Sequence, residues 1–439
     1  MLKVLKFGGS SVSNSTQFQK VKKIVEADEF RRFIVTSACG KEDKEDHKVT
    51  DLLYLTHAHI KYGVEYDSIF SLVEKKYISI RNDLKIDFDI EKEFLEIRSK
   101  LKKSMSVDFL VSRGEYLAAK MLAKYLNAEF VDATEFIRFN YDGSINLEKT
   151  EKKFNECIDK TKKYVFPGFY GEMPDGEIMC MSRGGSDITG SIIANILNAD
   201  IYENWTDVSG ILVADPRIVK DPKPIPLVSY EEIRLLSYMG ANVLHEEAMF
   251  PAKAKNIPIN IRNTNDMDNS GTIIKSDCKT DDEKNPPNVI TSITGRKDHI
   301  GLAIKKSTYS REGSLRKSLK VLEEFKIKYE VVTAGVDSLT IVVSKDAIEK
   351  YIYEIISRIK KETECDSINV IKDVALVAVV GRGMVNKKGM SGELFGTLGK
   401  NGINIMIISQ GSDELSIIVG IDNNDFEKAI NCIYNSFIK

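Results

Sequence analysis

The sequence predicts an α/β protein in which a domain built on a parallel sheet is followed by two ferredoxin-like units. A strand, a glycine turn, a helix and a second strand follow one another at the N-terminus, and a similar order returns from residue 178. The C-terminal third contains two segments of about 70 residues that share the order strand, helix, strand, strand, helix.

Composition limits the possible functions. With 439 residues, of which 42% are hydrophobic, the chain can form two or three domains. The net charge of −2 does not favour a nucleic-acid or acidic-membrane partner, and no apolar run reaches transmembrane length. Six scattered cysteines without a CxxC pair fit reduced thiols in the cytoplasm better than disulfides or a zinc site.

The N-terminal stretch KVLKFGGSSV carries the first candidate site. Val4 and Leu5 start a buried strand, and Gly8 and Gly9 allow the backbone to approach a ligand closely. The N–H groups of such a turn can bind phosphate oxygens, and Lys6 can add a positive charge. An ordinary strand–turn–helix with a surface lysine is the alternative.

The next region is mostly helical. A helix from residue 17 to 30 and a strand from 33 to 36 complete the first unit, and the charged loop KEDKEDHK reads as solvated. Thr50 opens a helix, where it caps the end or contacts a ligand. Glu115 is expected at a helix start, where the helix dipole favours its charge. His57 and His59 are spaced poorly for a shared metal ion.

A second glycine turn begins near Arg183, whose guanidinium can hold a carboxylate. Gly184 and Gly185 form the turn, and Ser186 or Asp187 is expected to cap the next helix. The following strand ends in Thr206 and Asp207, at the edge where parallel sheets bind ligands. A capping box is expected from Ser229 to Glu232, and the strand from Ile259 is expected to be the last of this domain.

These features suit phosphoryl transfer, which depends on positioning and charge neutralisation. The sequence has neither a Walker A motif nor a protein-kinase HRD motif. A carboxylate acceptor would need no general base, since its pKa of about 4 leaves it ionised at neutral pH. The lack of histidine in these motifs is consistent with such an acceptor.

Five motifs in order, KFGGSSV, VSRGE, SRGGSD, WTDVSGI with ADPR, and GANVLH, resemble the aspartate kinases of the amino-acid-kinase fold. The segment GMSGELFGTLGKNGINIMIISQGSDELSIIV is similar to an ACT domain, the small-molecule-sensing module of that family. The resemblance spans nearly the whole chain. It implies transfer of the γ-phosphate of ATP to the β-carboxylate of L-aspartate, the entry step to lysine, threonine and methionine.

The resemblance also implies roles for individual residues. Lys6 would stabilise the transferred phosphoryl group, and Asp187 would hold Lys6 in place. Aspartate would be bound by Ser37, Thr50, Glu115 and Arg183, with Arg183 on a carboxylate and Glu115 on the ammonium. The nucleotide site would comprise Gly8, Gly9, Ser10, Thr206, Asp207, Leu212, Arg217 and Asn242. Mg²⁺ would bridge the phosphates of ATP, and no protein side chain is assigned to a metal.

Three positions depart from the family pattern. The family often has tyrosine where Leu212 stands, lysine where Asn242 stands, and proline where Glu246 follows His245. These differences concern nucleotide affinity more than the type of reaction. The charged loop after Cys39 also looks enlarged.

The polar linker DCKTDDEKNPP marks the expected domain boundary. The kinase domain is expected over residues 1–283, a linker and first strand of the second ACT unit over 284–298, and the ACT units over 299–372 and 373–439. Residues 288–298 would pair with 373–439. Two chains would associate through their ACT sheets, as a dimer and possibly a tetramer.

An amino-acid effector, lysine or threonine, would bind at that interface. We expect it near Ser314, Tyr329, Glu330 and Asp337. Glu330 either pairs with a lysine ammonium or is a solvent-exposed acid. Two other functions stay open: a kinase of the same fold acting on glutamate, acetylglutamate or a nucleoside monophosphate, and a catalytically dead amino-acid sensor.

Overall fold

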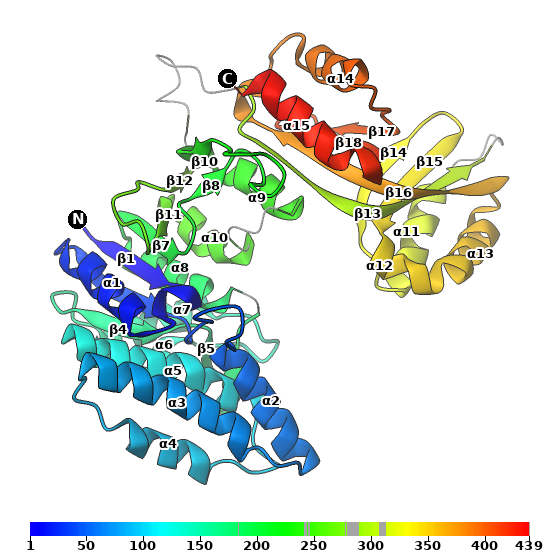
Figure 1. The fold of residues 1–439 in the computed structure, drawn as a ribbon. Helices are drawn as coiled ribbons and strands as arrows, with labels where there is room; N and C mark the ends of the chain where they lie inside the picture. The colour runs from blue at the N-terminus through cyan, green and yellow to red at the C-terminus, as the bar shows by residue number, and fades with distance from the viewer. Residues whose placement is uncertain are drawn as a thin grey trace. The chain divides into compact units, whose positions relative to one another are not determined.

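The computed structural model describes residues 1–182, 184–240, 244, 246–276, 278, 289–306 and 313–438 (Figure 1). The chain forms two compact units that interleave in sequence. The first contains Met1–Ile211, Pro224–Tyr230 and Asn242–Cys278, and the second contains Leu212–Lys223, Glu231–Ala241 and Lys279–Lys439. Residues 212–223 and 231–241, which we expected in the first domain, therefore group with the C-terminal unit.

The first unit is built on an eight-stranded sheet with the order β10-β12-β11-β7-β1-β2-β4-β3. Its strands are β1 (Lys3–Phe7), β2 (Arg31–Thr36), β3 (Glu129–Phe130), β4 (Tyr164–Pro167), β7 (Ile201–Thr206), β10 (Leu227–Ser229), β11 (Ile259–Asn263) and β12 (Thr272–Lys275). The pairs are parallel except β11 with β12, which is antiparallel. The expectation that the strand at Ile259 ends this domain was wrong, because β12 follows it.

Short strands lie outside this sheet. β5 (Tyr170–Glu172) pairs with β6 (Ile178–Cys180). β8 (Ile211–Leu212) pairs with β9 (Pro224–Ile225), and residues 213–223 connect the two strands. The helices are η1 (Gly9–Val12), α1 (Ser15–Glu26), α2 (Val49–Tyr62), α3 (Asp67–Leu84), α4 (Ile90–Ser99), α5 (Val107–Leu126), α6 (Ala133–Phe136), α7 (Leu147–Cys157), α8 (Gly185–Leu197) and α10 (Glu246–Ala254).

Strand alternation decides which helices cover which face of the sheet. Leu5, Ile34 and Val165 stand in one row across β1, β2 and β4 and pack into one core with α1, α3 and α5. The next row contains Lys6 and Phe166 and faces the other side. There Phe166 packs with aromatic rings of α6 and α7, while α8 brings Asp187 to Lys6. The sheet is therefore covered on both faces.

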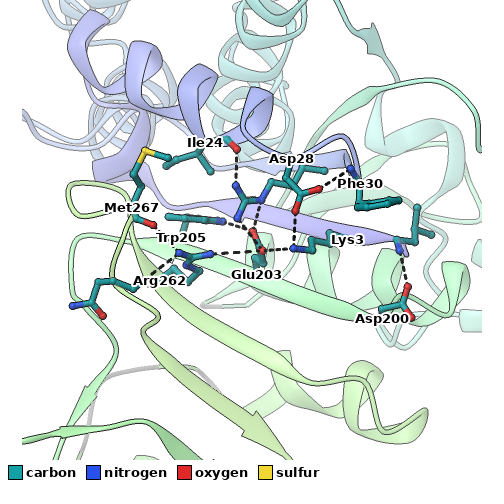
Figure 2. A network of polar contacts seen from close by, with 12 residues as sticks. Lys3, Ile24, Asp28, Phe30, Asp200, Glu203, Trp205, Arg262 and Met267 are labelled. Atoms are coloured by element: carbon teal, nitrogen blue, oxygen red, sulfur yellow. Dashed lines mark hydrogen bonds and ion pairs between the residues drawn. The ribbon is translucent and has the colours of Figure 1, made fainter.

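A buried network of charges joins four neighbouring strands of this sheet, β11, β7, β1 and β2 (Figure 2). The Glu203 side chain is 2% exposed, and its carboxylate binds Arg31 through Nε at 3.0 Å and Nη2 at 3.1 Å. The Trp205 indole N–H also donates to Glu203, and Lys3 lies 3.7 Å away. A second guanidinium, that of Arg262, lies over the Trp205 ring. The Glu203 carboxylate thus binds cationic side chains from both neighbouring strands, Lys3 of β1 and Arg262 of β11, as well as Arg31 of β2.

The second unit contains a six-stranded sheet in which all pairs are antiparallel. Its order is β14-β15-β13-β16-β18-β17. The strands are β13 (Ser292–Lys305), β14 (Tyr329–Ala334), β15 (Ser338–Ser344), β16 (Ser367–Val380), β17 (Ile407–Gln410) and β18 (Ser416–Asp422). The predicted repeat is confirmed, since β13 and β16 each start the order strand, helix, strand, strand, helix. Residues 292–296 lie opposite 376–380, as expected for the segment 288–298.

Amphipathic helices complete the second unit. They are α9 (Tyr230–Tyr238), α11 (Ser314–Glu324), α12 (Lys345–Ile348), η2 (Glu349–Tyr351), α13 (Ile352–Thr363), η3 (Arg382–Met384), α14 (Met390–Lys400), η4 (Asn423–Asp425) and α15 (Phe426–Phe437). α11 and α13 pack with β13 and β15 around an aliphatic core that includes Val321, Ile341 and Ile359. Over the described residues, no helix combines the length and the apolar character needed to cross a bilayer.

Candidate functional site

Lys6 lies on β1 near the centre of the first sheet, with only 8% of the residue exposed. Its ammonium is 2.6 Å from Asp187 Oδ1. A Cβ added to Gly8 would lie 3.6 Å from Lys6 Nζ, so the ammonium stands beside the glycine turn. The structure therefore places a nearly buried cation where the sequence predicted a phosphate-binding turn.

Asp187 lies in the first turn of α8, and its Oδ1 also accepts a hydrogen bond from Asn204 Nδ2 at 2.9 Å. The expectation that Ser186 or Asp187 caps this helix was wrong, because the N-cap is Gly184, with φ +78° and no side-chain cap bond. The carboxylate binds Lys6 instead. Its place in the first turn is favourable because the N-terminal end of a helix is positive.

The Gly8–Gly9 turn packs against the loop that follows β2. Gly8 N–H donates to Trp205 O at 3.0 Å, and Gly40 N–H donates to Gly9 O at 2.9 Å. A Cβ added to Gly9 would lie 2.9 Å from Ala38 O. Glycine is therefore required at position 9 by contact with the chain itself, whereas we had expected it to admit a ligand. Ser10 follows in η1 and is half-buried.

Glu115 is buried in α5 with 4% of the residue exposed. Burial raises the pKa of its carboxyl to about 8, although a hydrogen bond from the Ala38 N–H acts in the opposite direction. Among the described residues, its Oε2 has no hydrogen-bond partner. The expectation of a helix start was wrong, because α5 begins eight residues earlier, at Val107. The buried carboxylate thus has one oxygen open to a cation.

Ser37 and Thr50 flank the same loop. Ser37 N–H donates to Phe7 O at 3.1 Å, which fixes this residue beside the end of β1. Thr50 is the second residue of α2, whose N-cap is Lys48, so the predicted capping role of Thr50 was wrong. Both residues are half-buried. The loop between them therefore links the glycine turn to Glu115 through Gly40 and Ala38.

Thr206 and Asp207 lie where β7 ends, next to β1 in the sheet. Thr206 Oγ1 donates to Asp207 Oδ1 at 3.1 Å, and Asp207 is exposed. The carboxyl ends of β1, β2 and β7 therefore carry the glycine turn, Ser37 and this pair. That edge is the one at which parallel α/β sheets bind ligands.

Comparisons with known proteins show the family of this chain. A model of the amino acid kinase family matches residues 1–263, and a model of the ACT domain matches residues 377–437. Aspartokinase 3 of Bacillus subtilis (strain 168) is 35% identical over 452 residues, which cover 99% of this chain and 98% of the relative. The chain belongs to the aspartate kinases, which are ATP-dependent enzymes.

Solved structures place the kinase in the same fold. The aspartate kinase of Clostridium acetobutylicum, described as an allosteric enzyme, is 46% identical, with a TM-score of 0.91 and 99% of both chains covered. Aspartokinase III of E. coli, solved with aspartate and ADP, is 21% identical, with a TM-score of 0.78 and both chains fully covered at 100%. At that identity the second likeness concerns the fold alone.

Not every predicted residue of the kinase can be placed in this site. Arg183, Asn242 and His245 lie outside the described residues. Leu212 and Arg217 belong to the second unit. Within that unit the Arg217 side chain is 87% exposed and binds Asp215 at 2.6 Å, and this hydrogen bond is the main cause that lowers the pKa of Asp215. Glu246 starts α10.

The four expected effector residues of the kinase do not form one group. Ser314 and Asp337 line a cavity of about 100 Å³ with Ile304, Lys306, Leu315, Ala334, Ser338 and Leu339. Tyr329 and Glu330 lie at the other end of β14, where the Tyr238 hydroxyl donates to Tyr329 O at 3.2 Å. Within one chain the two pairs thus lie at opposite ends of β14, and their place in one effector site between two chains stays a prediction.

Sequence reasoning missed three residues that support the site. Asn204 holds Asp187, Lys76 Nζ donates to Gly40 O at 2.6 Å, and the Tyr77 hydroxyl donates to Gly114 O at 2.7 Å. Asn204 could have been found from the sequence, because it is a polar residue within an otherwise buried strand. The other two come from a helical region, residues 60–105, that matched no motif.

Proposed function

We propose that the kinase transfers the γ-phosphoryl group of ATP to the β-carboxylate of L-aspartate, giving 4-phospho-L-aspartate and ADP. The observation that carries this proposal is the Glu115 carboxylate, which is buried and has an unpaired oxygen among the described residues. With a pKa of about 8 this carboxyl is mostly protonated at neutral pH, and an ammonium group bound beside it would favour the ionised form. The amino group of aspartate supplies that ammonium.

Lys6 would act on the transferred group. Its ammonium stands beside the glycine turn and is held by Asp187, so it is oriented before the substrate binds. A preoriented charge stabilises the negative charge of a phosphoryl transition state without reorganisation. Ser37 and Thr50 would contact aspartate from the loop beside Glu115. Arg183 is proposed as the clamp on a substrate carboxylate from its motif alone.

ATP would bind along the carboxyl edge of the sheet, over Gly8, Gly9, Ser10, Thr206 and Asp207. No group of three potential metal ligands occurs among the described residues. Mg²⁺ usually binds phosphates and water with only one or two carboxylates, so this donor set fits an ion held mainly by ATP. When bound, the ion neutralises phosphate charge. Leu212, Arg217 and Asn242 stay predictions for the nucleotide site.

The second unit would bind an amino-acid effector, lysine or threonine, in the cavity lined by Ser314 and Asp337. The Lys306 ammonium is already bound to Thr363 O at 2.7 Å, while the exposed Asp337 carboxylate is positioned to accept an ammonium group. Sensing of an end product would place the reaction at the entry to lysine, threonine and methionine formation. Pairing of two copies through the edge strands β14 and β17 would give the dimer.

The test is ADP release by the full chain with ATP, Mg²⁺ and aspartate, followed by glutamate, acetylglutamate and a nucleoside monophosphate in place of aspartate. Release that depends on aspartate supports the proposal. Release that occurs only with another acceptor would show that the chain is a kinase with a different substrate. Folded protein that releases no ADP with any acceptor would support a sensor without catalytic activity.

A further inference from the structure

The charged loop after Cys39 is closed at its base. The Val49 N–H donates to Cys39 O at 3.1 Å, which brings the two ends of residues 40–48 together. Ser37 precedes this closure and Thr50 follows it. The geometry of the loop therefore fixes the spacing of two residues that the proposed function assigns to aspartate.

Lys76 of α3 binds both ends of this loop. Its side chain is 12% exposed, and its ammonium donates to Gly40 O at 2.6 Å and forms an ion pair with Asp46. Asp46 in turn accepts the Glu42 N–H at 2.8 Å and the His47 N–H at 2.7 Å. One ammonium thus connects both ends of the loop through a network of backbone bonds.

The charge on Asp46 is stabilised in this network. Burial raises the pKa of its carboxyl, but the hydrogen bonds from Lys76 and from backbone N–H groups outweigh that effect and lower the pKa overall. Asp46 is therefore ionised at neutral pH and attracts Lys76. Such charge-assisted bonds are stronger than neutral ones when partly shielded from water.

The next residue of α3, Tyr77, contacts helix α5, which carries Glu115. Tyr77 is fully buried at 0% exposure, and its hydroxyl donates to Gly114 O at 2.7 Å. Gly114 immediately precedes Glu115, and a Cβ added there would lie 2.8 Å from Ala38 Cβ. Adjacent residues of one helix therefore hold the loop and the Glu115 helix against each other.

We infer that Lys76 is a positioning residue that sets the affinity for aspartate by fixing the loop between Ser37 and Thr50. This inference rests on the proposed aspartate site. The glycine turn shares one bond with this loop, from Gly40 N–H to Gly9 O, but keeps two others that do not involve it, from Gly8 N–H to Trp205 O and from Ser11 N–H to Gly8 O. Loss of Lys76 should therefore affect aspartate more than ATP.

The experiment compares Lys76→Met with Lys75→Met in the full chain. Lys75 is exposed on the same helix and makes no hydrogen bond or ion pair among the described contacts, so it is a matched control. We expect Lys76→Met to raise the aspartate KM about 10- to 100-fold, as misplaced binding groups do. The ATP KM should change less than about 3-fold, and Lys76→Arg should recover part of the loss.

Hydrogen exchange gives a readout at the loop itself. The Val49 amide should exchange faster in Lys76→Met, with the amides of β1 and β2 unchanged. If Lys76→Met does not fold, Asp46→Ala tests the same contact from the loop side and should raise the aspartate KM in the same way. An aspartate KM within 2-fold of the Lys75→Met value, or equal losses for aspartate and ATP, would overturn the inference. An inactive wild-type protein would instead refute the proposed function.

Discussion

Lys6 and Asn204 lie directly opposite each other on the parallel strands β1 and β7, and both bind Oδ1 of Asp187. The register of one strand pair therefore places two donors on a single carboxylate. This arrangement orients the Lys6 ammonium from outside its own strand. It also means that the position of Lys6 depends on packing between β1, β7 and α8.

Lys6→Met should lower kcat at least about 100-fold, because a preoriented charge is lost from the phosphoryl group. Asn204→Ala should have a smaller effect, about 10-fold, since Asp187 keeps its bond to Lys6. Steady-state ADP release measures both, and circular dichroism checks the fold. A kcat near the wild-type value in folded Lys6→Met would remove its catalytic assignment.

Glu115→Gln should raise the aspartate KM about 100-fold or more while leaving the ATP KM nearly unchanged. The amide keeps the shape of the side chain but provides no negative charge for the substrate ammonium. Initial rates over a range of aspartate concentrations test this. Glu135→Gln is a suitable control, since this glutamate belongs to the capping box of helix α6. Equal changes for aspartate and ATP would contradict the role of Glu115.

The same residue predicts how stability depends on pH. The Glu115 pKa is about 8 in the folded protein, against an ordinary value of 4.5 for an unfolded chain, so between these pH values the folded state holds more protons than the unfolded state. The free energy of unfolding should therefore fall as pH rises through this range, by at most about 1.4 kcal/mol per pH unit from this group. Glu115→Gln should be more stable than wild type at pH 8, and the difference should shrink toward pH 5. Urea unfolding at both pH values measures it, and a gain that is equal at both would exclude titration of Glu115 as its cause.

Glu203→Ala should lower the free energy of unfolding by about 3–5 kcal/mol, because it leaves the buried Arg31 guanidinium without its carboxylate. Asp28→Asn is the control. Its side chain is 21% exposed and pairs with Lys3, so its loss should cost about 1 kcal/mol or less. Denaturant unfolding of both variants gives the comparison. Similar losses would mean that burial of the network does not determine its contribution.

Asp337→Ala should abolish inhibition by the effector and leave kcat and both KM values unchanged. The reason is that Asp337 lines the cavity of the second unit and has no place in the kinase site. Inhibition curves with lysine and with threonine test this, with Asp346→Ala on α12 as the control. Retained inhibition in Asp337→Ala would move the effector away from this cavity.

The strands and helix at the start of the chain, the two glycine turns and the tandem repeat could be predicted from the sequence. Each is marked by a pattern of residues that lie close together along the chain. Glu115 shows the limit of prediction from local sequence patterns. Its residue type and motif were recognised, but its mid-helix position and raised pKa depend on burial by distant segments. Lys76 could not be found, because its partners Gly40 and Asp46 lie 36 and 30 residues away and the contact carries no local pattern.

The interleaving of the two units has a practical consequence for dissecting the protein. The chain passes between them after residues 211, 223, 230, 241 and 278, so no single cut separates them. A fragment that starts at residue 279 lacks Glu232, a fully buried residue that accepts hydrogen bonds from Arg382 N at 2.9 Å and Thr291 Oγ1 at 2.6 Å within the C-terminal unit. Such a fragment would expose both donors, and ligand binding measured on it would describe an altered sensor.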